Sequence, residues 1–90
     1  MIRNSMSILT KILDAYPEDG FLKADGFDEA VIGIDTVGGR LVYSFSKCID
    51  ILMKEHKMDY EEAVEYFDYN VSGAYVGEQT PIWVNDNFDL

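Results

Sequence analysis

The sequence contains few of the residues from which common catalytic and metal sites are built. Its 90 residues include a single cysteine, Cys48, and a single histidine, His56. One cysteine cannot form an intramolecular disulfide, and a zinc site built from several cysteines is excluded. No spacing pairs His56 with a particular nucleophile or carboxylate. We therefore expect no catalytic residue, no cofactor and no bound metal, and a reducing, cytoplasmic environment.

Long apolar runs and clusters of basic residues are also missing. Polar residues interrupt every apolar run, so we expect neither a signal peptide nor a membrane-spanning segment. Seven Lys and Arg residues stand against 17 Asp and Glu residues, which gives a formal net charge of −10. Most of this excess lies in residues 48–90. It disfavours direct binding to nucleic acid or to an anionic membrane and favours a basic partner protein.

The residues that are present are typical of a packed globular domain. Hydrophobic residues make up 48% of the chain and charged residues 27%. A chain of this length can bury one modest core. Because no repeat, low-complexity tract or linker is found, we treat residues 1–90 as a single domain.

The first predicted element is an amphipathic helix over residues 4–16. Asn4 or Ser5 can cap its start, and Pro17 stops the pattern, so that residues 1–20 comprise the helix and a turn. Its apolar positions recur at helical spacing and are Ile8, Leu9, Ile12, Leu13 and Tyr16.

A β-hairpin and a second helix are predicted to follow. The β-branched and aromatic runs at residues 30–34 and 40–44 flank a glycine-rich turn at residues 35–39. From Phe45 the apolar period becomes helical, and Ser44 or Ser46 can cap this helix. Its apolar face comprises Phe45, Cys48, Ile49, Leu52, Met53 and His56.

The third helix has the strongest local signals. Asp59 followed by Glu62 matches a capping box, and we expect Gly73 to end the helix with a positive φ. Its apolar stripe comprises Tyr60, Ala63, Val64, Phe67 and Val71.

The segment GAYVGEQTPIWV, residues 73–84, leads into a last strand at residues 82–84. Gly77 permits a tight bend, and Pro81 favours an extended approach to the strand. Tyr75 and Trp83 are predicted either to cover the core or to provide apolar contacts for a partner. Together the segments predict one α+β domain in the order helix, hairpin, helix, helix, strand, with the helices packed on a small antiparallel or mixed sheet.

An acidic surface on the third helix is the strongest functional candidate. Glu61, Glu65 and Asp68 share one side, about 5–6 Å apart, a spacing near that of successive phosphates. Such a row of charges can imitate nucleic acid for a protein with a basic groove, and it can also be an ordinary solvated helix face. Exposed tyrosines beside it, Tyr66 and Tyr69, favour protein binding.

Two other acidic clusters leave a metal-dependent enzyme open as an alternative. Residues 25–29 and 86–89 supply carboxylates that can bind a divalent cation, although neither has EF-hand spacing. The glycine pair at residues 38–39 lacks the helix and lysine that a phosphate-binding loop requires.

Three stretches, at residues 43–53, 58–70 and 73–81, carry a resemblance to a family. These stretches, and the motif EEAxEYFxYNVxGAYVGEQTPIWV at residues 61–84, resemble a group of small proteins of bacteriophage and bacterial genomes to which no activity is attached. The similar region runs over residues 27–84. The resemblance implies a context, since small acidic phage proteins often bind and block a host enzyme, including restriction and CRISPR effectors.

We therefore favour a non-enzymatic, phage-type protein that inhibits a basic host protein in the cytoplasm. Glu61, Glu65 and Asp68 are predicted to supply the charge, and Tyr75 or Trp83 the apolar anchor. One alternative is a homo-oligomeric structural module, such as a homodimer, which pairs through residues 73–84. The other alternative is the small metal-dependent enzyme.

Overall fold

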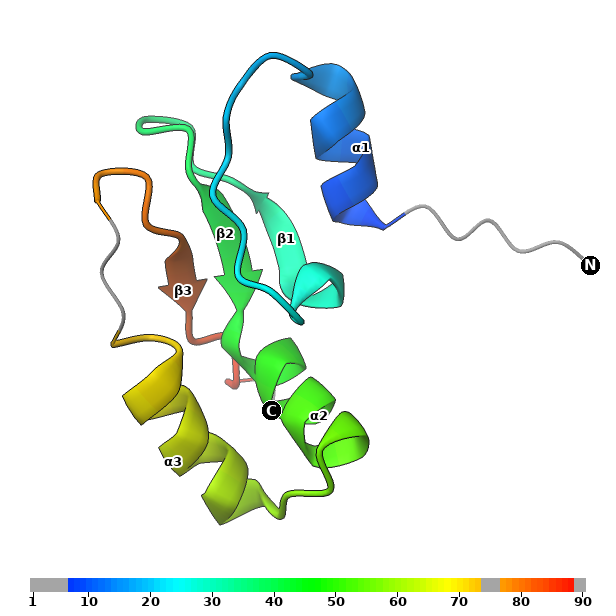
Figure 1. Cartoon of the computed structure of the whole chain (residues 1–90), viewed down its shortest axis with the longest axis vertical. Coiled ribbons are helices and arrows are strands. Elements are labelled where there is room, and N and C mark those ends of the chain that lie inside the picture. Colours follow the sequence, from blue (N-terminus) through cyan, green and yellow to red (C-terminus); the bar gives the residue numbers. More distant parts are fainter. Residues whose placement is uncertain (1–6, 74–76, 89–90) are drawn as a thin grey trace, which may run out of the picture.

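A computed structural model describes residues 7–73 and 77–88 of the chain (Figure 1). Its elements confirm the predicted α+β fold and its order, with one short 3₁₀-helix in addition. In chain order the described elements are α1 (Ile8–Ala15), η1 (Asp28–Ala30), β1 (Val31–Ile34), β2 (Leu41–Ser44), α2 (Phe45–Glu55), α3 (Tyr60–Asn70) and β3 (Ile82–Val84).

The sheet in the described part of the chain is mixed, with strand order β1-β2-β3. β1 and β2 pair antiparallel as a hairpin, whereas β3 pairs parallel to β2. The parallel pairing follows from the connection, because the chain leaves β2 through α2 and returns through α3 before it enters β3 (Figure 1). This topology places Trp83 of β3 directly beside Tyr43 of the central strand.

The hairpin turn confirms the prediction for residues 35–39. The Asp35 carboxylate accepts a hydrogen bond from the Gly38 amide at 2.7 Å, and the Gly39 amide donates to the Asp35 carbonyl at 2.8 Å. Gly39 has a φ of 72°, which a residue without a Cβ adopts at little cost. The glycines therefore serve chain reversal.

Helix α1 is shorter than predicted. Ser7 is its N-cap, and its hydroxyl accepts a hydrogen bond from the Thr10 amide at 3.2 Å. The predicted start at residue 4 is therefore wrong, and the caps proposed at Asn4 and Ser5 lie outside the described residues. Leu9 is the one buried residue of α1, a helix that contacts β1 and η1.

Helix α2 begins at Phe45, as predicted, and the Ser44 hydroxyl caps it by accepting from the Lys47 amide at 3.1 Å. The buried side chains on α2 are Cys48, Ile49 and Leu52. The prediction was wrong for Met53 and His56, which are exposed. The helix ends at Glu55, so His56 lies at the cap, beyond the face that packs on the core.

The end of α3 differs from the prediction at Gly73. The helix ends at Asn70, and the amides of Val71 and Ser72 both donate to the Phe67 carbonyl. Gly73 does not have a positive φ. Instead a Cβ there would lie 3.2 Å from the Asp68 carbonyl oxygen, so glycine allows a close passage of the chain.

The core lies between the sheet and the helices and includes residues of α1, η1, β1, β2, α2 and α3. Phe67 of α3 packs edge-on against Phe45 at a centroid distance of 5.2 Å and against Trp83 at 5.3 Å. These contacts hold α3 against the sheet and turn its opposite face to solvent. The buried residues of this cluster are Leu9, Phe27, Ala30, Val31, Leu41, Tyr43, Cys48, Ile49, Leu52, Ala63 and Phe67.

Candidate functional site

A capping box fixes the start of α3 and so the direction of its outer face. The Asp59 carboxylate accepts from the Glu62 amide at 2.8 Å, and the Glu62 carboxylate accepts from the Asp59 amide at 3.0 Å. Ala63 and Phe67 are buried on the inner face. Because Ala63 and Phe67 face the core, the opposite side of α3 faces solvent.

The predicted carboxylates Glu61, Glu65 and Asp68 are all exposed on α3. The ion pairs in residues 7–73 and 77–88 join Lys23 to Asp28 and Arg40 to Asp35. The three carboxylates therefore have no cationic partner within that part of the chain, and their charge is available to a molecule that approaches α3.

Two tyrosines extend this surface, as the sequence predicted. Tyr66 is 42% exposed and Tyr69 is 84% exposed. Together with the exposed carboxylates Glu61, Glu62, Glu65 and Asp68 they occupy the solvent-exposed side of the helix, which we call the acidic face of α3.

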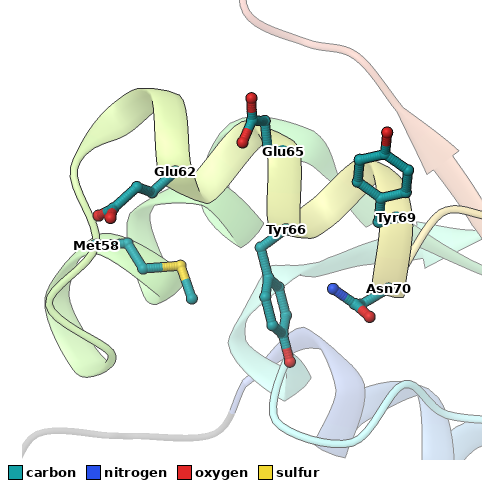
Figure 2. A pocket seen from close by; sticks show the side chains of 6 residues that line it. All are labelled: Met58, Glu62, Glu65, Tyr66, Tyr69 and Asn70. Carbon is teal, nitrogen blue, oxygen red and sulfur yellow. The ribbon is translucent and has the colours of Figure 1, made fainter.

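A shallow hollow of about 310 Å³ lies along part of this face, and of the three predicted carboxylates only Glu65 lines it (Figure 2). Figure 2 shows that Tyr66 and Asn70 point to one side of the helix, whereas Glu65 and Tyr69 point to the opposite side. The hollow offers carboxylates, phenol groups and a carboxamide to a partner. The residues that line it are Met58, Glu62, Glu65, Tyr66, Tyr69 and Asn70.

Trp83 was predicted either to cover the core or to provide an apolar contact for a partner. Its side chain does not protrude from the surface. Its ring packs on Tyr43 at a centroid distance of 4.8 Å and edge-on against Phe67 at 5.3 Å. The residue is half-buried, and its indole Nε1 is buried without a hydrogen-bond partner among the described residues. Tyr75, proposed alongside it, lies outside the described residues.

The indole of Trp83 lines a second hollow of about 410 Å³, which we call the Trp83 cavity. Its walls come from three segments that are far apart in the sequence: the loop before η1, the end of α3 and the entry to β3. Asn70 lines both hollows, so the cavity adjoins the acidic face of α3. The lining residues are Leu22, Lys23, Ala24, Asp25, Phe27, Asn70, Val71, Pro81 and Trp83.

Cys48 is not available as a nucleophile. Burial, together with the nearby charge of Asp86, raises the pKa of its thiol to about 12. The residue is completely buried on α2. The thiol is therefore protonated and enclosed at neutral pH, as expected of a core cysteine.

The described part of the chain lacks both a cluster of metal ligands and a helix suited to cross a membrane. Residues 7–73 and 77–88 contain no group of three or more His, Cys, Asp or Glu side chains placed to hold a metal ion. None of the helices described there combines the length and the apolar character needed for a membrane span.

Sequence reasoning missed two parts of this site. Glu62 was predicted only as a capping residue, and its exposure on the outer face of α3 was not predicted. The wall formed by Leu22, Phe27 and Pro81 has no local signal, because its members meet through tertiary packing. Glu62 stands three residues before Glu65, so helical periodicity was sufficient to predict that the two share a surface. The contact between the segments that contain residues 22 and 81 cannot be predicted from local sequence patterns.

Comparisons with models of protein families, with curated proteins and with solved structures found no match to this chain.

Proposed function

We propose that this chain is a non-enzymatic interaction protein that binds a basic surface of another protein through the acidic face of α3 and thereby inhibits it. The observation that carries the proposal is the presence on one helix of two exposed tyrosines and of carboxylates that have no cationic partner in residues 7–73 and 77–88. Carboxylates without internal partners attract a basic surface over several ångströms, which accelerates encounter and aligns the partner.

The tyrosines supply what charge alone does not. An exposed ion pair contributes little net free energy, since solvent and salt screen it. Tyr66 and Tyr69 add apolar contact area and hydroxyl groups, and tyrosine is enriched at interfaces for this reason. The acidic face of α3 is thus equipped for both attraction and contact.

The partner class follows from charge. A groove lined with Lys and Arg, of the kind that holds a nucleic-acid backbone, is complementary to a row of carboxylates. The resemblance to small phage proteins supports a host protein of this kind in the cytoplasm, with defence effectors such as restriction or CRISPR enzymes as examples. Occupation of such a groove would block its nucleic acid.

Affinity capture from a bacterial lysate at low and high salt tests the proposal. The native chain is compared with a variant in which Glu61, Glu65 and Asp68 are all changed to lysine. A matched control carries three lysines at exposed acidic positions away from this face, Asp14, Glu18 and Glu55. Both variants change the net charge equally, so only position distinguishes them.

We expect a basic, nucleic-acid-binding protein to be captured by the native chain and by the control at low salt, and to be lost at high salt. The reversal on α3 should abolish capture. The native chain should also compete with nucleic acid for the captured protein. Capture that survives the reversal on α3 would show that this face is not the binding surface.

One observation favours a homo-oligomeric module as a second candidate. β3 lies at the edge of the described sheet, and an edge strand can pair with the same strand of a second copy. Val84 is 37% exposed on this strand. Sedimentation at several concentrations should then show a dimer that Val84→Lys dissociates, whereas a monomer at all concentrations would eliminate this candidate.

A further inference from the structure

The Trp83 cavity has the properties of a preformed binding pocket for an apolar group. Its volume of about 410 Å³ lies within the range of ligand pockets. Most of its wall is apolar, and Lys23, Asp25 and Asn70 provide the polar groups among its lining residues. Leu22, at 39% exposure, forms an accessible part of the wall.

The wall is held in place by the core. Phe27 is buried, and the Trp83 ring is fixed between Tyr43 and Phe67. The amide of Ala24 donates a hydrogen bond of 2.8 Å to the Tyr43 hydroxyl, which ties the loop before η1 to the central strand. An entering side chain therefore does not have to order the site, which reduces the entropic cost of binding.

The surroundings of the cavity select the kind of occupant. Asn70 lines both this cavity and the hollow that contains Glu62 and Glu65. A chain that lies along α3 therefore passes from a negatively charged surface directly to an apolar pocket. A basic polypeptide with an apolar side chain is complementary to both, whereas a neutral apolar molecule uses only the cavity.

The helix geometry gives the spacing within such a polypeptide. From Glu62 to Asn70 the axial rise is roughly 12 Å, and from Glu65 to Asn70 it is roughly 7.5 Å. An extended chain covers these distances in roughly four and two residues. Because Glu65 and Asn70 also point to different sides of α3, these are minimum distances, and the basic side chains should stand at least about two and four positions from the apolar one.

We propose that the Trp83 cavity receives one apolar side chain from an extended basic segment of the partner protein, whose Lys or Arg residues lie against Glu62 and Glu65. This inference rests on the proposed function. It differs from the sequence-based prediction, in which Trp83 itself was the apolar anchor that enters the partner. Trp83 forms the wall of the pocket, and the partner supplies the anchor.

The probe for this proposal is a short peptide, acetyl-Lys-Gly-Lys-Gly-Phe-Gly-amide. Two comparison peptides replace its phenylalanine by serine or both lysines by glycine. Each is titrated into the full chain. Trp83 is the only tryptophan, so its fluorescence and its indole N–H resonance report directly on the cavity.

We expect the phenylalanine peptide to change both Trp83 signals and to bind at least about tenfold more tightly than the serine peptide, since burial of an aromatic side chain is lost in the latter. The lysine-free peptide should bind more weakly than the parent. Added salt should weaken binding of both lysine peptides and leave binding of the lysine-free peptide unchanged.

Two sets of variants locate the contacts. Leu22→Gln should weaken the phenylalanine peptide without affecting the serine peptide, and Leu13→Gln, at a similar exposure of 40% on α1, is its matched control. The double variant E62Q/E65Q should weaken both lysine peptides. Glutamine at position 62 can retain the capping hydrogen bond. Circular dichroism checks that each variant is folded.

Three results would overturn the proposal. The first is equal binding of the phenylalanine and serine peptides, and the second is a Leu22→Gln variant that binds like the native chain. In both cases the acidic face of α3 would keep its proposed function if E62Q/E65Q still weakened binding. The third is equal binding of the lysine-free peptide, which would make the cavity a site for neutral apolar groups.

Discussion

The carboxylate of Asp86 accepts a hydrogen bond of 2.6 Å from the hydroxyl of Ser44, although 42 positions separate the two residues. Its other oxygen accepts from the Ser46 amide at 3.0 Å. Ser44 is also the N-cap of α2. The segment after β3 therefore completes the cap of a helix that begins directly after β2, and it places a negative charge at the positive end of that helix.

Removal of this carboxylate should destabilise the fold. We expect Asp86→Ala to lower the free energy of unfolding by about 1 kcal/mol, the usual cost of a lost helix cap. Urea denaturation followed by circular dichroism measures the change. Asp19→Ala, at another exposed aspartate, is the control and should have little effect. Equal stability of the two variants would show that the Asp86 contacts do not contribute.

The same contact should make stability depend on pH. Burial tends to raise the pKa of Asp86, but hydrogen bonds from Ser44 and Ser46 outweigh it, so that the pKa lies below its ordinary value of 3.8. A lowered pKa in the folded state stabilises the fold above pH 3.8, and this contribution is lost as the pH falls through the folded value.

Comparison with Asp86→Asn isolates this effect, because asparagine does not titrate. The difference in unfolding free energy between the native chain and Asp86→Asn should be constant near neutral pH and should shrink below pH 3.8. A difference that stays constant down to strongly acidic pH would mean that Asp86 has the same pKa in both states.

The Tyr43 hydroxyl should be needed for the wall of the Trp83 cavity. Tyr43→Phe removes the acceptor of the Ala24 amide, and we expect a loss of about 1 kcal/mol in unfolding free energy. Hydrogen exchange at the Ala24 amide should accelerate. Tyr69→Phe, at a residue that is 84% exposed, is the matched control. Unchanged exchange in Tyr43→Phe would show that the Ala24 amide is protected in another way.

The Cys48 thiol should react very slowly in the folded chain. With its pKa raised to about 12 and its side chain buried, the reactive thiolate is scarce and enclosed at neutral pH. In a Ser72→Cys variant a colourimetric thiol reagent should show a fast phase from the exposed cysteine and a slow phase from Cys48. Denaturant should merge the phases, and a single fast phase in the folded variant would contradict the burial of Cys48.

The starts of α2 and α3 were predicted correctly, because a capping residue stands directly before the first helical residue. Asp59 and Glu62 bond to each other's backbone across one turn, and Ser44 caps a helix that begins at the next residue. For α1 several capping residues precede the apolar positions, and the structure uses Ser7. The end of α3 was predicted wrongly, because the requirement at Gly73 is a close passage past Asp68 and not a positive φ.

The sequence by itself determined the elements, their order and the exposed acidic face of α3, because caps, turns and apolar periods act between residues a few positions apart. Only the tertiary structure decided which distant residues meet: the parallel pairing of β3 with β2, the contact of Asp86 with Ser44, and the Trp83 cavity. These depend on how the core packs. The same packing encloses Trp83 beside Tyr43 and Phe67, and its apolar character alone did not reveal this position.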